Sequence, residues 1–284
     1  MMTHQVPFDG RFSIGEFSTG PPDGMPSKKV LEEELDDLVD ELDTLQQRLF
    51  ADQRFAVLAV FQAMDAAGKD STIRKVFSGV NPAGFRVHAF GRPSELELRH
   101  DFLARVAERL PERGKIGIFN RSHYEEVLVV RVHPEFLAAQ HLPGVDMLRI
   151  WTERFESIRG FEQHLARNGI AVVKFWLNIS RKEQKKRFLS RIDEEDKNWK
   201  FRLGDLDDRA RWKEFQSAYE TMLRETSRAW APWYAIPADD KAYMRVAVAR
   251  VVVETLRNLD PRFPEFGPEQ RRELEEGRRR LEKE

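Results

Sequence analysis

The chain has 284 residues, of which 33% are charged and 41% hydrophobic, with a formal net charge of −1 and no cysteine. The lack of cysteine excludes disulfides, thiolate metal sites and cysteine nucleophiles, and the balanced charge argues against a generally basic nucleic-acid-binding protein. Because the sequence has no apolar stretch of about 20 residues and no readable secretory signal, we expect a cytoplasmic protein that binds neither membranes nor nucleic acid.

The N-terminal part of the chain divides into an arm and a helix. Residues 1–27 are rich in Gly and Pro and predict an irregular arm. From Leu31 to Leu49, leucines recur at alternating spacings of four and three, which predicts an amphipathic helix over residues 28–54 with Ser27 placed to cap it. The sequence leaves open whether this helix packs on its own domain or contacts a second subunit.

Five apolar runs of strand length follow, at residues 55–62, 85–90, 115–120, 170–179 and 233–238. Helical stretches separate them, and this alternation is typical of a parallel sheet covered on both faces. We expect one catalytic domain over residues 55–258, interrupted by a charged helical insertion at residues 181–228. Residues 259–284 predict a charged tail, either helical or frayed.

The first predicted strand leads into "AMDAAGKD", residues 63–70. A strand that turns through a glycine loop into a helix directs backbone N–H groups and the helix dipole at one point, which favours an anion. Lys69 occupies the lysine position of the P-loop pattern G-x-x-x-x-G-K-[ST], although Ala63 and Asp70 depart from it. The residues expected to hold phosphate here are Ala66, Ala67, Gly68, Lys69, Asp70, Ser71, Arg74 and Lys75.

Asp65 is an unusual residue for a phosphate loop. A carboxylate among phosphate-binding donors repels the ligand unless a cation intervenes. We therefore expect Asp65 to hold Mg²⁺ or to orient the attacking phosphate. The alternative role is to cap the following turn.

A second candidate segment, "FNRSHYEE", ends the third predicted strand. Asn120 stands where a Walker B strand has an aspartate, and it offers a hydrogen bond but no charge. Arg121 lies at the carboxyl end of a parallel strand, where open α/β sheets bind ligands, and its guanidinium suits phosphate oxygens. The alternative is that Arg121 pairs with Glu125 or Glu126.

The insertion concentrates positive charge. Between Arg181 and Lys213 it carries twelve Lys/Arg against eight Asp/Glu. The run is either a solvated helix face or a lid that neutralises a transferring phosphoryl group and excludes water. Trp199 in this segment either frames a base or packs in the interior.

Together, "AMDAAGKDSTIRKV" and "IFNRSHYEEVLVVRVHP" resemble the family-2 polyphosphate kinases, and the likeness extends over residues 55–256. The resemblance implies a three-layer α/β/α P-loop kinase fold with a helical lid. It also implies phosphoryl transfer between inorganic polyphosphate and nucleotides that depends on Mg²⁺, with Mn²⁺ as a substitute, in a homo-oligomer, either a dimer or a tetramer.

The resemblance also assigns residues. Asp65, Lys69 and Arg121 match catalytic positions, and "YEE" with Glu125 resembles the subgroup that phosphorylates both AMP and ADP to form ATP. In this scheme Arg187 closes from the lid, and Glu125 joins Asp65 at the metal. The residues expected to bind the nucleotide are Asn120, Glu125, Asp239 and Asp240, and the further cations expected to bind polyphosphate are Arg131, Arg181, Lys186 and Arg191.

Two other functions fit parts of the sequence. "DAAGKDST" is similar to the loop of thymidylate kinases, which suggests a nucleoside monophosphate kinase that uses ATP as donor. Ala63, Asp70 and Asn120 suggest a nucleotide-binding regulatory protein that has lost turnover. The charged insertion and "NRSHYEE" favour polyphosphate over both.

Overall fold

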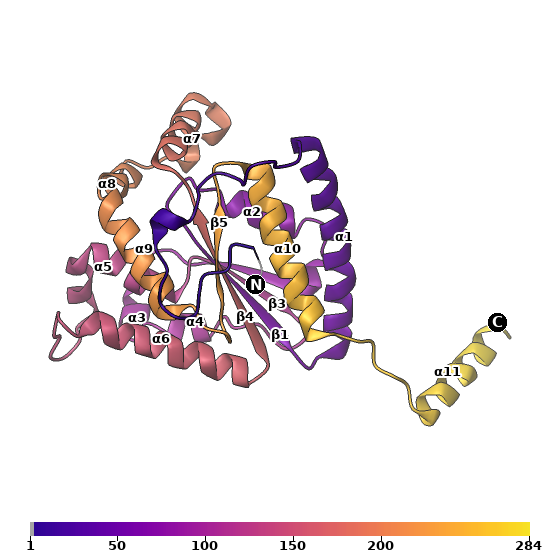
Figure 1. The fold of residues 1–284 in the computed structure, drawn as a ribbon. Helices are drawn as coiled ribbons and strands as arrows, with labels where there is room; N and C mark the ends of the chain where they lie inside the picture. The colour runs from indigo at the N-terminus through magenta and orange to yellow at the C-terminus, as the bar shows by residue number, and fades with distance from the viewer. Residues whose placement is uncertain (1–2) are drawn as a thin grey trace.

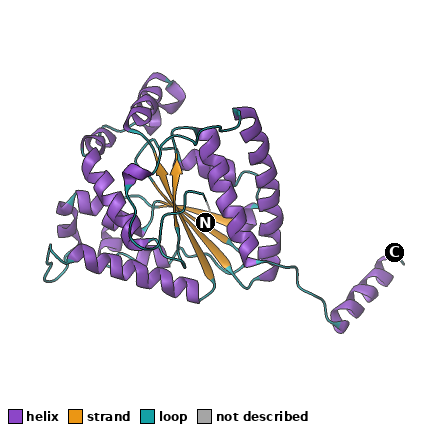
Figure 2. Cartoon of the chain, in the orientation of Figure 1, coloured by secondary structure: helices purple, strands orange, loops and turns teal. Residues whose placement is uncertain are grey.

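The structure, a computed structural model, describes residues 3–284, and in that range the strands form one five-stranded parallel sheet in the order β2-β3-β1-β4-β5 (Figure 2). The strands are β1 (Ala56–Gln62), β2 (Phe85–Ala89), β3 (Ile116–Asn120), β4 (Ile170–Asn178) and β5 (Trp233–Pro237). Each lies inside one of the five apolar runs, so the predicted parallel α/β fold is confirmed.

Strand β1 is the centre of the sheet. All seven of its residues are buried, and it pairs with β3 on one side and β4 on the other. After β1 the chain crosses to β2 and β3 on one side of the sheet, and after β3 it crosses to β4 and β5 on the other side. The carboxyl ends of β1 and β3 therefore lie at the point where the strand order reverses. Open α/β sheets bind their ligands at such a point.

Helices cover both faces of the sheet (Figure 1). One layer contains α1 (Lys28–Asp52), α2 (Lys69–Val76) and α10 (Lys241–Leu259), and the other contains α6 (Ile150–Arg167) and α9 (Trp212–Thr226). The shorter helices are η1 (Ile14–Glu16), η2 (Pro82–Gly84), α3 (Glu95–Leu98), α4 (Ala104–Ala107), η3 (His123–Val127), α5 (Val129–Val132) and η4 (Pro134–Gln140). The expected three layers are therefore present, and no helix within residues 3–284 is long and apolar enough to cross a membrane.

The predicted amphipathic helix is α1, and it packs on its own domain against α10. Ser27 caps it by accepting a hydrogen bond from the Val30 amide. Its buried stripe includes Leu35, Val39 and Leu42, whereas Leu38 is only partly buried. Val39, and not the heptad position Leu38, is therefore buried, because a straight helix has 3.6 residues per turn and a heptad repeat has 3.5.

The predicted N-terminal arm is partly embedded in the fold. Val6 and Phe12 are fully buried, and the Val6 amide donates to the Trp233 carbonyl of β5 at 2.9 Å. At the other end of the chain, α11 (Pro268–Leu281) contains no buried residue and lies away from the body on an extended segment (Figure 1).

The charged insertion has two structural parts. Helices α7 (Arg181–Asp193), η5 (Glu195–Lys200) and α8 (Gly204–Ala210) lie beyond the carboxyl edge of the sheet, where α7 projects from the body (Figure 1). Helix α9 instead packs on the sheet, with the Tyr219 ring 5.6 Å from that of Trp176 in β4. We call residues 181–210 the lid segment.

Candidate active site

The phosphate loop connects β1 to α2 through two left-handed residues, Ala66 (φ +63°) and Gly68 (φ +107°). A left-handed alanine is strained, and such strain is typical of functional loops. Lys69 begins α2, is 8% exposed, and donates from Nζ to the Ala63 carbonyl at 2.9 Å. Burial lowers the Lys69 pKa, and the nearby Arg121 cation lowers it further.

Arg121 connects this loop to the end of β3. Its Nη2 lies 2.8 Å from Asp65 Oδ1, and its Nη1 lies 3.3 Å from Glu125 Oε2. Arg121 is also left-handed, with φ +62°. Glu125 and then Asp65 raise the Arg121 pKa, whereas burial raises the pKa of Glu125. The predicted grouping of Asp65, Arg121 and Glu125 is therefore present, and Arg121 does form the ion pair with Glu125 that we considered as an alternative.

Two neighbouring amides complete the loop's surroundings. Asn120 Nδ2 donates to Asp70 Oδ1 at 2.5 Å, so it binds the first turn of α2. Gln62, the last residue of β1, is a site residue that the sequence analysis does not predict. In the amide orientation that pairs both its nitrogen and its oxygen, the nitrogen donates to Glu125 Oε1 at 2.9 Å and the oxygen accepts from Ser122. The available signal was a lone Gln at the end of an otherwise apolar strand.

Arg187 does not occupy the position expected of a lid residue that closes over phosphate. It is 8% exposed, and its Nη1 donates to the Ala67 carbonyl at 2.7 Å. Its Nη2 donates to the carbonyls of Ala238 at 2.6 Å and Asp239 at 3.1 Å, and its Nε donates to Glu183 at 2.9 Å. These backbone acceptors occupy the guanidinium, so Arg187 joins α7 to the phosphate loop and to the segment after β5.

Asp239 and Asp240 are also engaged within the protein. The Asp239 carboxylate accepts from the Thr19 hydroxyl at 2.9 Å and from the Ser180 amide at 2.8 Å. Asp240 caps α10 by accepting from the Tyr243 amide at 2.8 Å. Their predicted role in binding the nucleotide therefore has no support in these contacts.

The remaining predicted cations are dispersed. The Arg131 guanidinium lies 6.0 Å from the centre of the Phe155 ring of α6, among the helices that cover the other face of the sheet from α2. Lys186 and Arg191 lie in the lid segment, where Arg191 is 3.5 Å from Asp205. Arg181, at the start of α7, is exposed. Trp199 is 76% exposed, so the interpretation that it packs in the interior was wrong.

A group of cations beside the phosphate loop was only partly predicted. Arg74 lies on α2, and Lys241 and Arg245 lie on α10. Burial lowers the pKa of both α10 residues, and neighbouring cations lower it further, Arg187 for Lys241 and Arg74 for Arg245. Among residues 3–284 none of the three forms an ion pair, and the buried Arg245 Nε has no hydrogen-bond partner. The sequence signal for the α10 pair was an i, i+4 spacing at the start of an apolar helix.

A cavity of about 240 Å³ opens on the other side of Arg121, toward the chain that follows β2. It is lined by both charged and aromatic side chains. Besides Arg121 and Glu125, its lining includes Arg92, Phe102, Glu126, Phe136 and Gln140. A cavity that combines apolar side chains with several charged ones suits a small organic ligand that carries charge.

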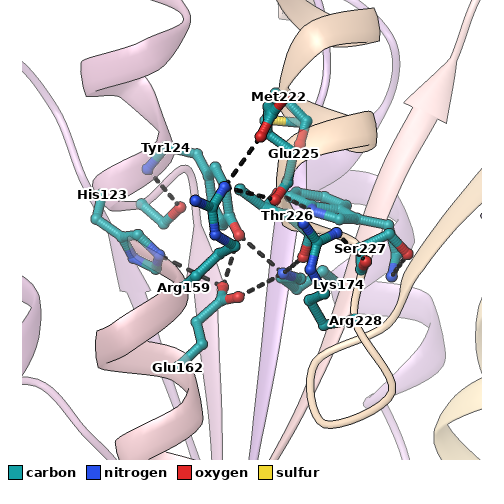
Figure 3. A network of polar contacts seen from close by, with 12 residues as sticks. His123, Tyr124, Arg159, Glu162, Lys174, Met222, Glu225, Thr226, Ser227 and Arg228 are labelled. Atoms are coloured by element: carbon teal, nitrogen blue, oxygen red, sulfur yellow. Dashed lines mark hydrogen bonds and ion pairs between the residues drawn. The ribbon is translucent and has the colours of Figure 1, made fainter. Parts of the chain in front are cut away.

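A buried ionic network supports the "YEE" segment from behind (Figure 3). Lys174 of β4 lies 2.5 Å from Glu162 of α6 and donates to the Tyr124 hydroxyl at 2.8 Å and to the Thr226 carbonyl at 2.9 Å. Tyr124 in turn donates to Glu162 at 2.7 Å. Burial lowers the Lys174 pKa to about 8. Since Tyr124 precedes Glu125, the network fixes the backbone that carries the acidic side chain.

Comparison with known proteins agrees with this geometry. The family model described as "Polyphosphate kinase 2 (PPK2)" matches residues 25–264. An ADP-polyphosphate phosphotransferase of Rhodopseudomonas palustris is 49% identical over 95% of this chain and 94% of its own length. An AMP/ADP-polyphosphate phosphotransferase of Meiothermus ruber is 45% identical over 93% of this chain and 96% of its own.

A solved structure of a polyphosphate kinase 2 has the same fold. The crystal structure of polyphosphate kinase 2 from Arthrobacter aurescens TC1 superposes with a TM-score of 0.85 at 34% identity, covering 93% of this chain and 92% of that one. The family match, the relatives and the fold agree over most of the sequence, and they show that the chain belongs to the polyphosphate kinase 2 family.

Proposed function

We propose that this polyphosphate kinase transfers phosphoryl groups between inorganic polyphosphate and both AMP and ADP. The observation that carries the proposal is the Arg121 guanidinium, which lies between Asp65 of the phosphate loop and Glu125 at the cavity. One side of Arg121 has a loop suited to a phosphate donor, and the other has a cavity suited to an acceptor. The reaction forms a bond from an acceptor phosphate oxygen to phosphorus and breaks the terminal phosphoanhydride of polyphosphate, which leaves one phosphate shorter.

In this proposal, Lys69 and Arg121 stabilise the charge on the transferring phosphoryl group. Phosphoryl transfer has a loose transition state, so catalysis depends on positioning and electrostatic stabilisation and not on a covalent enzyme intermediate. The Ala63 carbonyl holds Lys69 Nζ, and Asp65 and Glu125 hold Arg121 from two sides. Both cations are thus held in place before the substrates bind.

We further propose that Asp65, with Glu125 nearby, contributes to a Mg²⁺ site that the substrates complete. Residues 3–284 contain no cluster of three or more His, Asp or Glu side chains suited to a metal. The carboxylates of Asp65 and Glu125 nevertheless fit Mg²⁺, because proteins usually bind this ion through one or two carboxylates together with substrate phosphates. When bound, the cation neutralises charge on the phosphates.

The cations Arg74, Lys241 and Arg245 are proposed to bind the polyphosphate chain outside the phosphate loop. They form no ion pairs within the described chain, and Arg245 Nε is buried without a partner. Polyphosphate carries about one negative charge per phosphate, so a surface of unpaired cations suits it, and its affinity is expected to fall with salt. The exposed lysines of α7 extend this surface along the lid segment.

Acceptance of AMP as well as ADP is proposed from Glu125, which reaches both Arg121 and the cavity. Its carboxylate lines the cavity beside Arg121, so it is placed to hold a cation or a water next to the acceptor phosphates. The relative from Meiothermus ruber is named for both acceptors, whereas that from Rhodopseudomonas palustris is named for ADP alone. We also propose that the enzyme is cytoplasmic and homo-oligomeric. Light scattering of the purified protein tests the oligomeric state.

The test is an anion-exchange time course of AMP, ADP and ATP with purified protein, Mg²⁺ and long-chain polyphosphate. The expected result is conversion of AMP to ADP and then to ATP by the intact protein, and none by Lys69→Ala. If AMP reacts only when ATP is supplied, the monophosphate-kinase function is correct instead. If only ADP reacts, the role of Glu125 is wrong, and the variant Glu125→Asn should then leave the acceptor preference unchanged.

A further inference from the structure

The N-terminal arm reaches the active-site edge of the sheet. We name residues 4–20 the N-terminal strap. It begins beside β5, where the Ala235 amide donates to the His4 carbonyl at 2.9 Å, and it buries Phe12 against Phe17, with ring centres 4.6 Å apart. Further along, Asn178 at the end of β4 donates to the Phe17 carbonyl at 3.0 Å. The strap is therefore bound at several points along its length.

The strap ends in a reciprocal contact with the segment after β5. The Thr19 hydroxyl donates to Asp239 Oδ2 at 2.9 Å, and the Asp239 amide donates to the Thr19 carbonyl at 2.9 Å. The other Asp239 carboxylate oxygen accepts from the Ser180 amide at 2.8 Å, at the N-cap of α7. One aspartate therefore joins the strap, the end of β5 and the start of the lid segment.

From Asp239 the contacts continue to the phosphate loop. The Asp239 carbonyl accepts from Arg187 Nη2 at 3.1 Å, and Arg187 Nη1 donates to the Ala67 carbonyl at 2.7 Å. Ala67 lies directly before Gly68 and Lys69. Three consecutive hydrogen bonds thus lead from the Thr19 hydroxyl to the backbone of the phosphate loop.

We infer that Thr19 is a positioning residue for phosphoryl transfer, acting through Asp239 and Arg187 on the phosphate loop. Neither Thr19 nor Asp239 lines the cavity beside Arg121. The loop holds left-handed Ala66, a conformation that persists only where the surroundings fix it. Arg187, held in turn by Asp239 and the strap, supplies part of that support. A small displacement of a reacting group is enough to lower turnover strongly, so losing this support should appear in kcat.

The test compares Thr19→Val, which keeps the side-chain shape but removes the donor, with Thr19→Ser, which keeps the donor. The matched control is Ser18→Ala, because among the described residues the exposed Ser18 hydroxyl bonds to Gly20 of its own turn and to no other. Two quantities are measured on the full chain: steady-state kcat and KM with polyphosphate and AMP, and hydrogen exchange of the amides of residues 63–69 without substrate. The kinetic measurement rests on the proposed function, whereas the exchange measurement does not.

Thr19→Val is expected to lower kcat by about tenfold or more while KM for AMP is retained. Its phosphate-loop amides should exchange faster, and its melting temperature should stay close to that of Ser18→Ala. Thr19→Ser should restore both kcat and exchange. An unchanged kcat together with unchanged loop exchange in Thr19→Val overturns the inference. Faster exchange throughout the sheet with a matching fall in melting temperature also overturns it, because Thr19 is then only structural.

A wild-type protein without polyphosphate activity rejects the proposed function and leaves the exchange measurement as the test of the strap. In that case, faster exchange confined to residues 63–69 in Thr19→Val still supports the positioning path. Unchanged exchange rejects the path as well.

Discussion

Asp65 and Arg121 face each other across the carboxyl ends of β1 and β3, with 2.8 Å between Oδ1 and Nη2. The strand order brings the two residues together, because β1 and β3 are neighbours in the sheet although Asp65 and Arg121 lie 56 residues apart in sequence. Arg121 is thereby held by a loop from one strand and by Glu125 from its own. The pair connects the proposed donor side of the site to the acceptor side.

Asp65→Asn is expected to lower kcat by about a hundredfold or more with little loss of stability. Asn keeps the size of the side chain and an oxygen acceptor for Arg121, but it removes the charge proposed to hold Mg²⁺ and to orient the acceptor. The measurement is the initial rate of ADP formation at saturating polyphosphate, with thermal unfolding in parallel. A variant that retains more than half of its turnover would show that Asp65 only positions Arg121.

Arg245→Ala is expected to raise KM for polyphosphate and to flatten its dependence on salt. Each cation that no longer contacts a phosphate reduces the slope of log affinity against log salt by about 1. The matched control is Arg279→Ala, which removes the same charge from α11, the helix that lies away from the body. If the two variants change KM for polyphosphate equally at low and at high salt, the polyphosphate chain does not contact Arg245.

Glu125→Gln is expected to change how stability depends on pH. Burial raises the Glu125 pKa above its ordinary value of 4.5. At pH values between 4.5 and the raised pKa, the folded state therefore binds more protons than the unfolded state. Stability in the wild type therefore falls as pH rises from about 4.5 through the raised pKa of the folded state. In Glu125→Gln this component is absent, so its free energy of unfolding should increase relative to wild type across that interval. Urea titrations at several pH values measure the difference, and a constant difference contradicts the assigned shift.

Lys174→Met is expected to destabilise the fold by about 3–5 kcal/mol, because it leaves Glu162 charged and buried without its cation. The double variant Lys174→Met/Glu162→Leu should recover most of the loss, since removing both charges of a buried pair is often close to neutral. Urea unfolding of the wild type, the two single variants and the double variant gives the coupling energy. If the double variant is as unstable as Lys174→Met, the loss comes from packing and not from the unpaired charge.

Leu42→Ala is expected to cost about 2–5 kcal/mol, and Leu38→Ala clearly less. Both leucines occupy predicted seam positions of α1, but Leu42 is fully buried against the core while Leu38 is only partly buried. Chemical denaturation of the two variants compares the positions directly. Equal losses would indicate that the seam also packs on a second subunit.

The sequence predicted those features that depend on local chemistry. The apolar runs predicted the five strands of the described sheet, and the glycine loop after a buried strand predicted the turn into α2, because strand and loop signals involve neighbouring residues. Arg187 shows what such reasoning misses: its side chain is a cation like those that bind phosphate, but its acceptors are carbonyls at residues 67, 238 and 239. The contacts of Asp239 could not be predicted for the same reason, since its partner Thr19 lies 220 residues away.

The Arg187 contacts also limit how the lid segment can move. Gln184 donates to the Asp65 carbonyl at 2.9 Å and Arg187 binds the same loop, so the first two turns of α7 are attached to the site itself. At the other end, Phe215 and the other buried residues of α9 pack into the core. Between them, Phe188 is buried, and Arg211 donates to the Val132 carbonyl at 2.7 Å. The described side-chain hydrogen bonds of residues 189–207, in contrast, all lie within the lid segment. If the lid segment moves over polyphosphate, we therefore expect the movement to involve residues 189–207 and to leave the loop that carries Asp65 and Lys69 in place.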